Sequence, residues 1–383
     1  MPLKPRLQIR LFDNNLASPT LIDDLTDRVA NLTFSTALNG GFKVCSFALP
    51  TTIGEAWLWL HREGKRGYHF SRITIHEDQT LIWEGRVMEV ELQVQAGEQS
   101  LRITATGYWG ACRDRFYTAT GNTNWASGSH TIDDIIKEML TEECPDINSD
   151  QTNITATSRD VVGLDLTVKE YPQTRINELT ALSDSDGSMW FFAIWDSRTP
   201  YLTKRDASAV DWYVWMEDLG NLNLRQSAME LRNAVLPFIS TTEGTNQTDT
   251  TSLLLYPRRE VKFTVPTGTN ANTQADAASA QATDRGFPRQ SQAFNISGRI
   301  YRTTGESGGR LEEAQKWRVR AGDVVRIQDL VPVSASTPSL DDVRTFFVME
   351  TNYTASNDTL SLQPDRRSRR LTNILPKLGA IER

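Results

Sequence analysis

The chain has 383 residues, of which 39% are apolar and 23% charged, so it is long enough for two or three domains and is not globally disordered. Its formal net charge of −7 argues against a protein whose main task is to grip nucleic acid. The longest apolar run, 189–195, is far shorter than the roughly 20 residues of a membrane-spanning helix. The N-terminus also lacks the apolar core of a secretory signal, so we expect a protein that is made and kept in the cytoplasm.

Residues 1–118 predict a β domain. Apolar and polar residues alternate over 7–11, 88–94 and 101–103, which is the period of half-buried strands. The link Ala96-Gly97-Glu98 between two of these runs indicates a hairpin. Several short strands at this spacing favour an antiparallel barrel or sandwich.

Residues 119–210 predict a small α/β insert. Thr131 can cap a helix over 132–140, and a second helix is expected over 174–183, where the apolar residues repeat at helical spacing. The apolar run 189–195 then predicts a strand.

Residues 211–369 predict a second β domain with a helical insertion. The segment contains a polar loop over 240–252 and an Ala-rich helix over 274–283. We expect the main strands over these ranges: 294–301, 319–327, 345–353 and 359–363. Residues 370–383 are expected to be a basic C-terminal tail.

A short internal repeat links the two β domains. Residues 86–89 read Arg-Val-Met-Glu and residues 347–350 read Phe-Val-Met-Glu, and each stretch leads into a hairpin that closes its β domain. Three shared residues can arise by chance, and they are also what a duplicated domain would leave.

Motifs for catalysis and metal binding are weak. Gly305 to Gly309 match the GxSxG pattern around Ser307, but all four histidines precede residue 131, so no general base follows the serine. The stretch Asp184 to Gly187 resembles the start of a calcium loop, yet its twelfth position is Trp195 instead of glutamate.

Other polar clusters give no ligand set either. His69 and His76 lack further metal ligands nearby, and no nucleotide-binding glycine loop occurs. Cys45, Cys112 and Cys144 form no CxxC pair and are expected to be ordinary, partly buried thiols. We therefore predict no enzyme activity and no catalytic, cofactor-binding or metal site.

Two aromatic pairs and the tail leave alternatives open. Trp57 and Trp59, like Tyr213 and Trp215, would share one face of a strand, where they can stack on sugars or pack in a core or subunit interface; we favour packing. The tail is either solvated or lies on an acidic neighbour, and its basic residues are Arg366, Arg367, Arg369, Arg370 and Lys377.

The order of these segments resembles the baseplate hub or tail-tip proteins of tailed bacteriophages, relatives of the spike bases of type VI secretion and other contractile injection systems. The resemblance spans nearly the whole chain and is carried by three features: the Gly85-Arg86 step with its hairpin, the α/β insert and the Gly322-Asp323 turn. It implies two related antiparallel tube-type β-barrels with a small α/β domain between them. The family has no catalytic signature to carry over.

The resemblance also implies a function. Three copies would form a pseudo-sixfold ring that caps the tail tube or a distal tail protein and contacts the tape measure protein and tip spike or fibre proteins. DNA would pass through its channel transiently, without specific binding, past a neutral or acidic wall. We expect a structural virion protein at the tail tip, assembled in the host cytoplasm and without wall-degrading activity. The alternatives are a hexameric distal tail protein, a carbohydrate-binding tail adhesin, and a hydrolase that relies on Ser307 alone.

Overall fold

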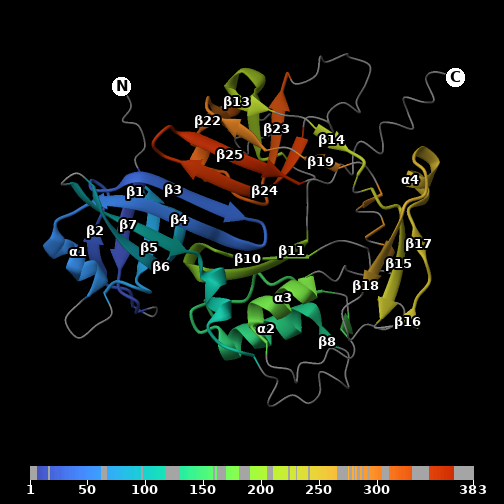
Figure 1. Ribbon diagram of the computed structural model, residues 1–383, viewed down its shortest axis with the longest axis horizontal. Coiled ribbons are helices and arrows are strands. Elements are labelled where there is room, and N and C mark those ends of the chain that lie inside the picture. The colour runs from blue at the N-terminus through green and yellow to red at the C-terminus, as the bar shows by residue number, and fades with distance from the viewer. Residues whose placement is uncertain are drawn as a thin grey trace.

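The computed structural model is mainly β, as the sequence predicts (Figure 1). It describes residues 7–15, 18–61, 67–95, 98–117, 130–157, 160–161, 170–180, 190–204, 210–222, 225–229, 231–239, 242–264, 275, 278–279, 281–282, 285–286, 289–291, 293–303, 310–329 and 345–365. Most strands belong to one 17-stranded sheet. None of the helices in these ranges is long and apolar enough to cross a membrane.

The first unit comprises the strands before residue 107. Their pairing order is β2-β1-β5-β6-β7-β4-β3, antiparallel throughout. The elements are β1 (Leu7–Phe12), β2 (Leu21–Asp24), β3 (Ala30–Ala37), β4 (Gly40–Pro50), α1 (Ile53–Leu60), β5 (Arg72–Glu77), β6 (Thr80–Gln95) and β7 (Glu98–Thr106). The expected strands over 7–11, 88–94 and 101–103 are thus confirmed.

The second unit comprises the strands from residue 212 onward, apart from a small separate sheet. Its pairing order is β13-β20-β25-β24-β23-β12-β21-β22. The pair β14–β19 continues the β13–β20 ladder in the same register. The elements are β12 (Trp212–Trp215), β13 (Leu219–Leu222), β14 (Arg225–Ser227), β19 (Arg289–Ser291), β20 (Phe294–Ile296), β21 (Ile300–Thr303), β22 (Leu311–Ala314), β23 (Val324–Gln328), β24 (Thr345–Thr354) and β25 (Thr359–Pro364).

Both units contain the same five-strand antiparallel ladder. In the first unit its order is β3-β4-β7-β6-β5, and in the second it is β13-β20-β25-β24-β23. The strands of each ladder also follow one another in the same chain order. This agreement makes the two units related in topology.

A matching β-bulge shows that the short sequence repeat is structural. The β6–β7 register shifts between Val87 and Glu89, and the β24–β25 register shifts between Val348 and Glu350. The extra residue is therefore the methionine of the repeated Val-Met-Glu stretch in both units. A bulge bends its strand and increases the local twist, so both units bend at the same point.

The turn before β5 in the first unit is repeated before β23 in the second. In the first unit the Phe70 N–H donates to the Val87 carbonyl at 2.8 Å, and the Val87 N–H donates to Ser71 at 2.9 Å. In the second unit the Gly322 N–H donates to Val348 at 2.8 Å, and the Val348 N–H donates to Asp323 at 2.9 Å. Both turn residues have positive φ, 65° at Phe70 and 102° at Gly322.

Core positions repeat along with the backbone. Phe47 lies opposite Ile103 in the first unit, and Phe294 lies opposite Leu362 in the second. All four side chains are buried. Together with the bulge and the turn, these matches confirm the expectation of two related β units.

The pairing runs from one unit into the other. Glu350 to Thr354 of β24 pair antiparallel with Thr33 to Ala37 of β3, so the two ladders share one sheet in the described residues. Figure 1 shows β3 and β4 beside β24 and β25 at the centre of the molecule.

The insert packs two helices on strands that join the same sheet. It comprises β8 (His130–Thr131), α2 (Ile132–Glu143), β9 (Asp160–Val161), α3 (Pro172–Thr180), β10 (Trp190–Trp195) and β11 (Thr199–Lys204). Both expected helices and the strand are present, although Thr131 donates its hydroxyl to Asp134 at 2.9 Å instead of capping a backbone N–H. β10 pairs parallel with β4 and so ties the insert to the first unit. The boundaries at 118/119, 210/211 and 369/370 stay predictions.

The second unit carries its own insertion between β14 and β19. A four-stranded sheet of β15 (Ala234–Ile239), β16 (Thr242–Glu243), β17 (Gln247–Thr248) and β18 (Glu260–Thr264) stands apart from the large sheet in Figure 1. The prediction of a polar loop over 240–252 is therefore wrong in part, because this stretch contains β16, β17 and the start of α4 (Thr250–Leu255). Asp249 caps α4 by accepting from the Ser252 N–H. In the Ala-rich segment, Ala278 and Ala282 pack against Val235.

Candidate functional site

One face of the shared sheet is polar from β6 through to β20. Along β3, β24 and β25 buried residues alternate with accessible ones, so the apolar core covers only the opposite face. We call the accessible side the polar face, and it includes Glu89, Glu91, Gln93, Arg102, Thr104, Ser46, Thr33, Ser35, Asn352, Thr354, Ser361, Gln363 and Asn295. Apart from the partly exposed Val44, this strip is polar and can line a water-filled space.

The polar face is hollowed where the two units meet. A shallow depression of about 400 Å³ spans β3, β4, β24 and β25. Its lining includes Thr33, Ser35, Lys43, Glu350, Asn352 and Gln363. Its place at the junction means that the polar face is concave there.

Few charges lie on this face, and they nearly cancel. The Lys43 ammonium pairs with the Glu350 carboxylate at 2.9 Å. Glu91 lies opposite Arg102 in the β6–β7 ladder, and Glu89 is the remaining acidic group among the side chains described on this face. A phosphate backbone needs many lysine or arginine contacts to be held, and the described side chains of this face do not offer them.

Buried polar contacts fix the junction between the units. The hydroxyls of Thr36 in β3 and Thr351 in β24 lie 2.6 Å apart in the core. The Thr36 hydroxyl also accepts from the Ala321 N–H at 2.9 Å, next to the repeated turn. Buried groups of this kind are costly to separate, so the junction is built to hold one geometry.

Glu77 adds an ion pair between the units, in which the carboxylate is buried and the arginine is partly exposed. Its side chain is only 2% exposed, and it accepts from Arg318 at 2.5 Å and from the Trp317 indole N–H at 3.1 Å. Glu77 lies on β5 of the first unit, whereas both donors lie in the 3₁₀ turn after β22 of the second. Removing Arg318 would leave the buried Glu77 charge without its ion-pair partner.

Arg320 ties all three parts of the chain together. Its guanidinium bonds both carboxylate oxygens of Asp196 in the insert, at 2.9 and 3.1 Å, and donates to the Leu81 carbonyl of the first unit at 2.8 Å. It also lies over the rings of Phe42 and Trp195, with the guanidinium carbon 5.2 and 5.6 Å from the ring centres. The planar guanidinium fork suits this bidentate and stacked arrangement, which a lysine would not reproduce.

A further buried cluster joins the first unit to the insert. The Glu84 carboxylate is fully buried and accepts from Arg72 and from the Arg198 backbone N–H, both at 2.6 Å. Burial raises the pKa of Glu84, and the positive charge of Arg72 opposes that shift. We found no local pattern in the sequence that would pair these three residues.

The candidate catalytic and metal residues give no assembled site. Ser307, the Asp184–Gly187 stretch and the basic tail from Arg366 lie outside the described residues. His76 lies on β5, and burial lowers its pKa. Within the described ranges no three histidine, cysteine, aspartate or glutamate side chains gather as metal ligands.

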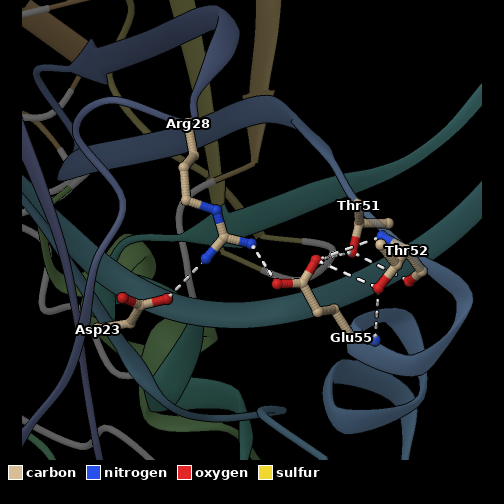
Figure 2. Close-up of polar contacts among 5 residues, drawn as sticks. All are labelled: Asp23, Arg28, Thr51, Thr52 and Glu55. Atoms are coloured by element: carbon tan, nitrogen blue, oxygen red, sulfur yellow. Dashed lines mark hydrogen bonds and ion pairs between the residues drawn. The ribbon is translucent and has the colours of Figure 1, made fainter.

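The two aromatic pairs differ in secondary structure and in exposure. Trp57 and Trp59 do not share one face of a strand, because they lie on helix α1, where Trp57 is 55% exposed and Trp59 is buried. The overlooked signal is the capping box of Thr52 and Glu55 (Figure 2), in which each side chain satisfies the other's backbone N–H. Tyr213 and Trp215 do share a face of β12, where both are half-buried and Trp215 packs edge-on against Tyr301.

The three cysteines are free thiols, as expected, and they are more deeply buried than the partial burial that was expected. Cys112 and Cys144 are nevertheless neighbours, with their sulfur atoms 3.6 Å apart in the core of the insert. Their separation of 32 residues in the chain gave no sign of this contact.

Solved structures of phage tail proteins share this fold over nearly the whole chain. A tail protein of Neisseria meningitidis MC58 superimposes on 95% of the chain and 98% of its own length, with TM-score 0.61 and 10% identity. The 43 kDa tail protein of prophage MuSo2 from Shewanella oneidensis covers 96% and 98%, with TM-score 0.57 and 9% identity. The prophage tail protein gp18 of Listeria monocytogenes EGD-e covers 97% and 98%, with TM-score 0.53 and 11% identity.

The chain has the fold of phage tail proteins. The expected resemblance is thereby confirmed at the level of architecture. No protein-family model matches the chain, and no curated protein matches it in sequence.

Proposed function

We propose that the chain is a structural hub or tail-tip protein of a phage-type tail, in which three copies form a pseudo-sixfold ring. The repeated five-strand ladder, with its repeated bulge and turn, carries this proposal. Three chains with two related units each present six similar positions, which can seat on a tube of sixfold symmetry. The fold shared with phage tail proteins supports the same assignment.

In this ring the polar face would line the channel. Its concave shape at the junction and its nearly balanced charges suit a wall past which DNA moves without being held. The ring would cap the tail tube or a distal tail protein, meet the tape measure protein within the channel, and carry tip spike or fibre proteins below. Its place would be the tail tip of the virion, after assembly in the host cytoplasm.

The chain would act through its interfaces and not through catalysis. The partly buried contacts of Glu77 and Arg320 hold the two units in one relative orientation, which is what a ring of fixed curvature requires. A hexameric distal tail protein needs only one tube-type unit per chain, so the duplication favours three copies over six.

Electron cryomicroscopy of the purified full-length chain tests the ring. We expect threefold particles with six similar lobes around a central channel. Sixfold particles, or particles without a channel, would contradict the proposal.

The adhesin alternative has a separate test. Trp57 is the exposed tryptophan of its pair, and Trp215 lies half-buried beside Tyr301. Under the hub proposal, a glycan array should give no signal that Trp57→Ala or Trp215→Ala removes. A sugar signal that either variant abolishes would favour the adhesin.

A further inference from the structure

The junction inside the chain shows how one unit can add to the next. Strand β24 pairs with β23 only as far as Phe347, and from Glu350 to Thr354 the same edge pairs with β3. Its other edge pairs with β25. The second half of β24 is therefore enclosed between a strand of its own unit and a strand of the other unit.

The equivalent strand of the first unit has an open edge. β6 pairs with β5 up to Arg86 and with β7 from Arg86 to Gln95. Past Val87, the edge away from β7 has no ladder partner among the described residues. Glu89 and Glu91 on this half are exposed. An edge of this kind presents unpaired backbone groups that can receive another strand.

A complementary open edge lies on the second unit. Strands β13 and β14 together correspond to β3, but where β3 pairs with both β4 and β24, they pair only with β20 and β19 in the described part of the chain. In the described part of the chain, the outer strands β2 and β22 also have a free edge. The edges of β6 and of β13–β14 differ from those because their equivalents in the other unit form the junction inside the chain.

We propose that β6 of one copy pairs antiparallel with β14 of the next copy, in the register that joins β24 to β3 within the chain. This interface rests on the proposed three-copy ring and specifies which strands close it. Such a contact is head-to-tail, so repeating it generates a ring when the rotation closes. The partner is a second copy of this chain.

The register follows from matched positions. Ser35 contacts Val44, three residues before the buried Phe47 of β4, and Arg225 lies opposite Ser291, three residues before the equivalent Phe294. Arg225 therefore corresponds to Ser35.

The matching position on β6 comes from the bulge. Counting from the repeated Val-Met-Glu stretch makes Glu91 equivalent to Asn352, and Asn352 lies opposite Ser35 inside the chain. The interface accordingly places Glu91 opposite Arg225, with Val90 opposite Gln226 and Glu89 opposite Ser227.

The charges favour this pairing over the symmetric one. A glutamate opposite an arginine is a favourable cross-strand pair. Two β6 edges meeting each other would instead bring Glu89 and Glu91 of both copies together, and like charges facing each other destabilise a ladder. The acidic edge therefore favours a strand with a positively charged residue at this register position, and β14 has Arg225 there.

Cysteine cross-linking in the full-length chain tests the register. The native cysteines are buried, so they leave the background low. We expect mild oxidation of the Glu91→Cys, Arg225→Cys double variant to give covalently linked trimers. The matched control is the Glu91→Cys, Gln226→Cys double variant, in which residue 226 would face the opposite side of the sheet from residue 91. The yield of linked products from this control should be at least tenfold lower. Asn352→Cys with Ser35→Cys serves as the intramolecular positive control.

The outcomes separate the interface from the ring. A trimer by native mass in which the Glu91–Arg225 pair does not link, while the internal control does, overturns the interface and leaves the ring. A monomer or a hexamer overturns both.

Charge reversal is a second test of the interface, and it introduces no new cysteine. Glu91→Arg or Arg225→Glu alone should weaken trimer assembly at least tenfold, and the double reversal should restore it. Single reversals that leave the trimer intact would also overturn the interface.

Discussion

The two units share their ladder and differ in what connects its strands. In the first unit β3 and β4 are uninterrupted, and α1 links β4 to β5. In the second unit the corresponding strands open into the insertion that carries β15 to β18, and the β21–β22 hairpin takes the place of α1. Connections at the ends of strands tolerate insertions, whereas a ladder does not tolerate a change of register. The common ladder is therefore the part that the proposed ring needs twice, and the connections were free to diverge.

Helix α1 shows how firmly such a divergent connection is attached. Its capping box is extended by Arg28, which bridges Glu55 at 3.4 Å and Asp23 at 3.1 Å (Figure 2). The hydrogen bond from the Thr52 backbone, and then the Arg28 charge and the Thr51 and Thr52 hydroxyls, lower the pKa of Glu55. Ala56 and Trp59 pack the helix into the core of the first unit, while Trp57 stays exposed.

The largest expected effect tests whether the matched core positions are energetically equivalent. Phe47→Ala and Phe294→Ala should each lower the free energy of unfolding by about 3–5 kcal/mol, because both rings are buried opposite an aliphatic residue of the hairpin strand. Urea denaturation followed by tryptophan fluorescence measures both. If one variant lost less than about 1 kcal/mol, the cores would not be equivalent.

Asp323 should give the second unit a pH effect that the equivalent position of the first unit lacks. Burial raises the pKa of Asp323 to about 6, although its carboxylate accepts from the Arg320 N–H and the Trp212 indole N–H. Because the folded pKa lies above the unfolded value, this group's stability contribution is full below about pH 4 and is lost as the pH rises through about 6. A two-unit shift corresponds to at most about 2–3 kcal/mol.

The comparison with the first unit supplies the control for that pH effect. The equivalent residue there is Ser71, which does not titrate in this range. Asp323→Asn keeps an acceptor oxygen for both donors, so its unfolding midpoint should change less between pH 4 and 6 than that of the unaltered chain. Identical pH profiles for the two proteins would show that a group other than Asp323 causes the pH dependence of stability.

The repeated turn gives the next largest effect. Gly322→Phe should cost about 1–3 kcal/mol, because at φ 102° a side chain is strained although the nearest atom, Leu38 Cδ1, lies 3.5 Å from the added Cβ. Phe70→Gly at the equivalent position should stay within about 1 kcal/mol, since relief of the positive φ offsets the lost contact with Arg86. Thermal unfolding of both variants checks this, and equal losses would mean that the turns are not alike.

The smallest effect concerns the polar face. Glu91→Ala and Asn352→Ala should each change the free energy of unfolding by less than about 0.5 kcal/mol, because both residues are exposed. We expect only Glu91→Ala to weaken assembly, since Asn352 lies at the junction inside the chain. Denaturation and sedimentation of the same samples separate the two effects. Weaker assembly of Asn352→Ala alone would reverse the proposed roles of the two edges.

Much of the fold could be predicted from local patterns. The period-two runs located β1, β6 and β7, and the repeated Val-Met-Glu stretch pointed to the duplication. Helix α1 was missed because its two tryptophans suggest a strand, and the helical signal lies just outside them in Thr52 and Glu55. Pairing of β3 with β24 could not be predicted, because it joins residues more than 300 positions apart and depends on both ladders being complete.

The candidate site could not be predicted from the sequence for the same reason. The polar face and the contacts of Glu77, Arg320 and Glu84 form only when three separate segments fold together. In the sequence, no neighbouring residues mark Glu77, Arg320 or Glu84 as a charge that forms a contact between segments. What the sequence did offer was a weak overall charge, which agrees with the nearly balanced face.

Native mass spectrometry of the full-length chain tests the central claim most directly. If two related units per chain serve to match a sixfold tube, the assembled species should contain three copies of the 43.1 kDa chain. A stable assembly of six copies would show that each chain fills one position of the ring instead of two, and would contradict the account.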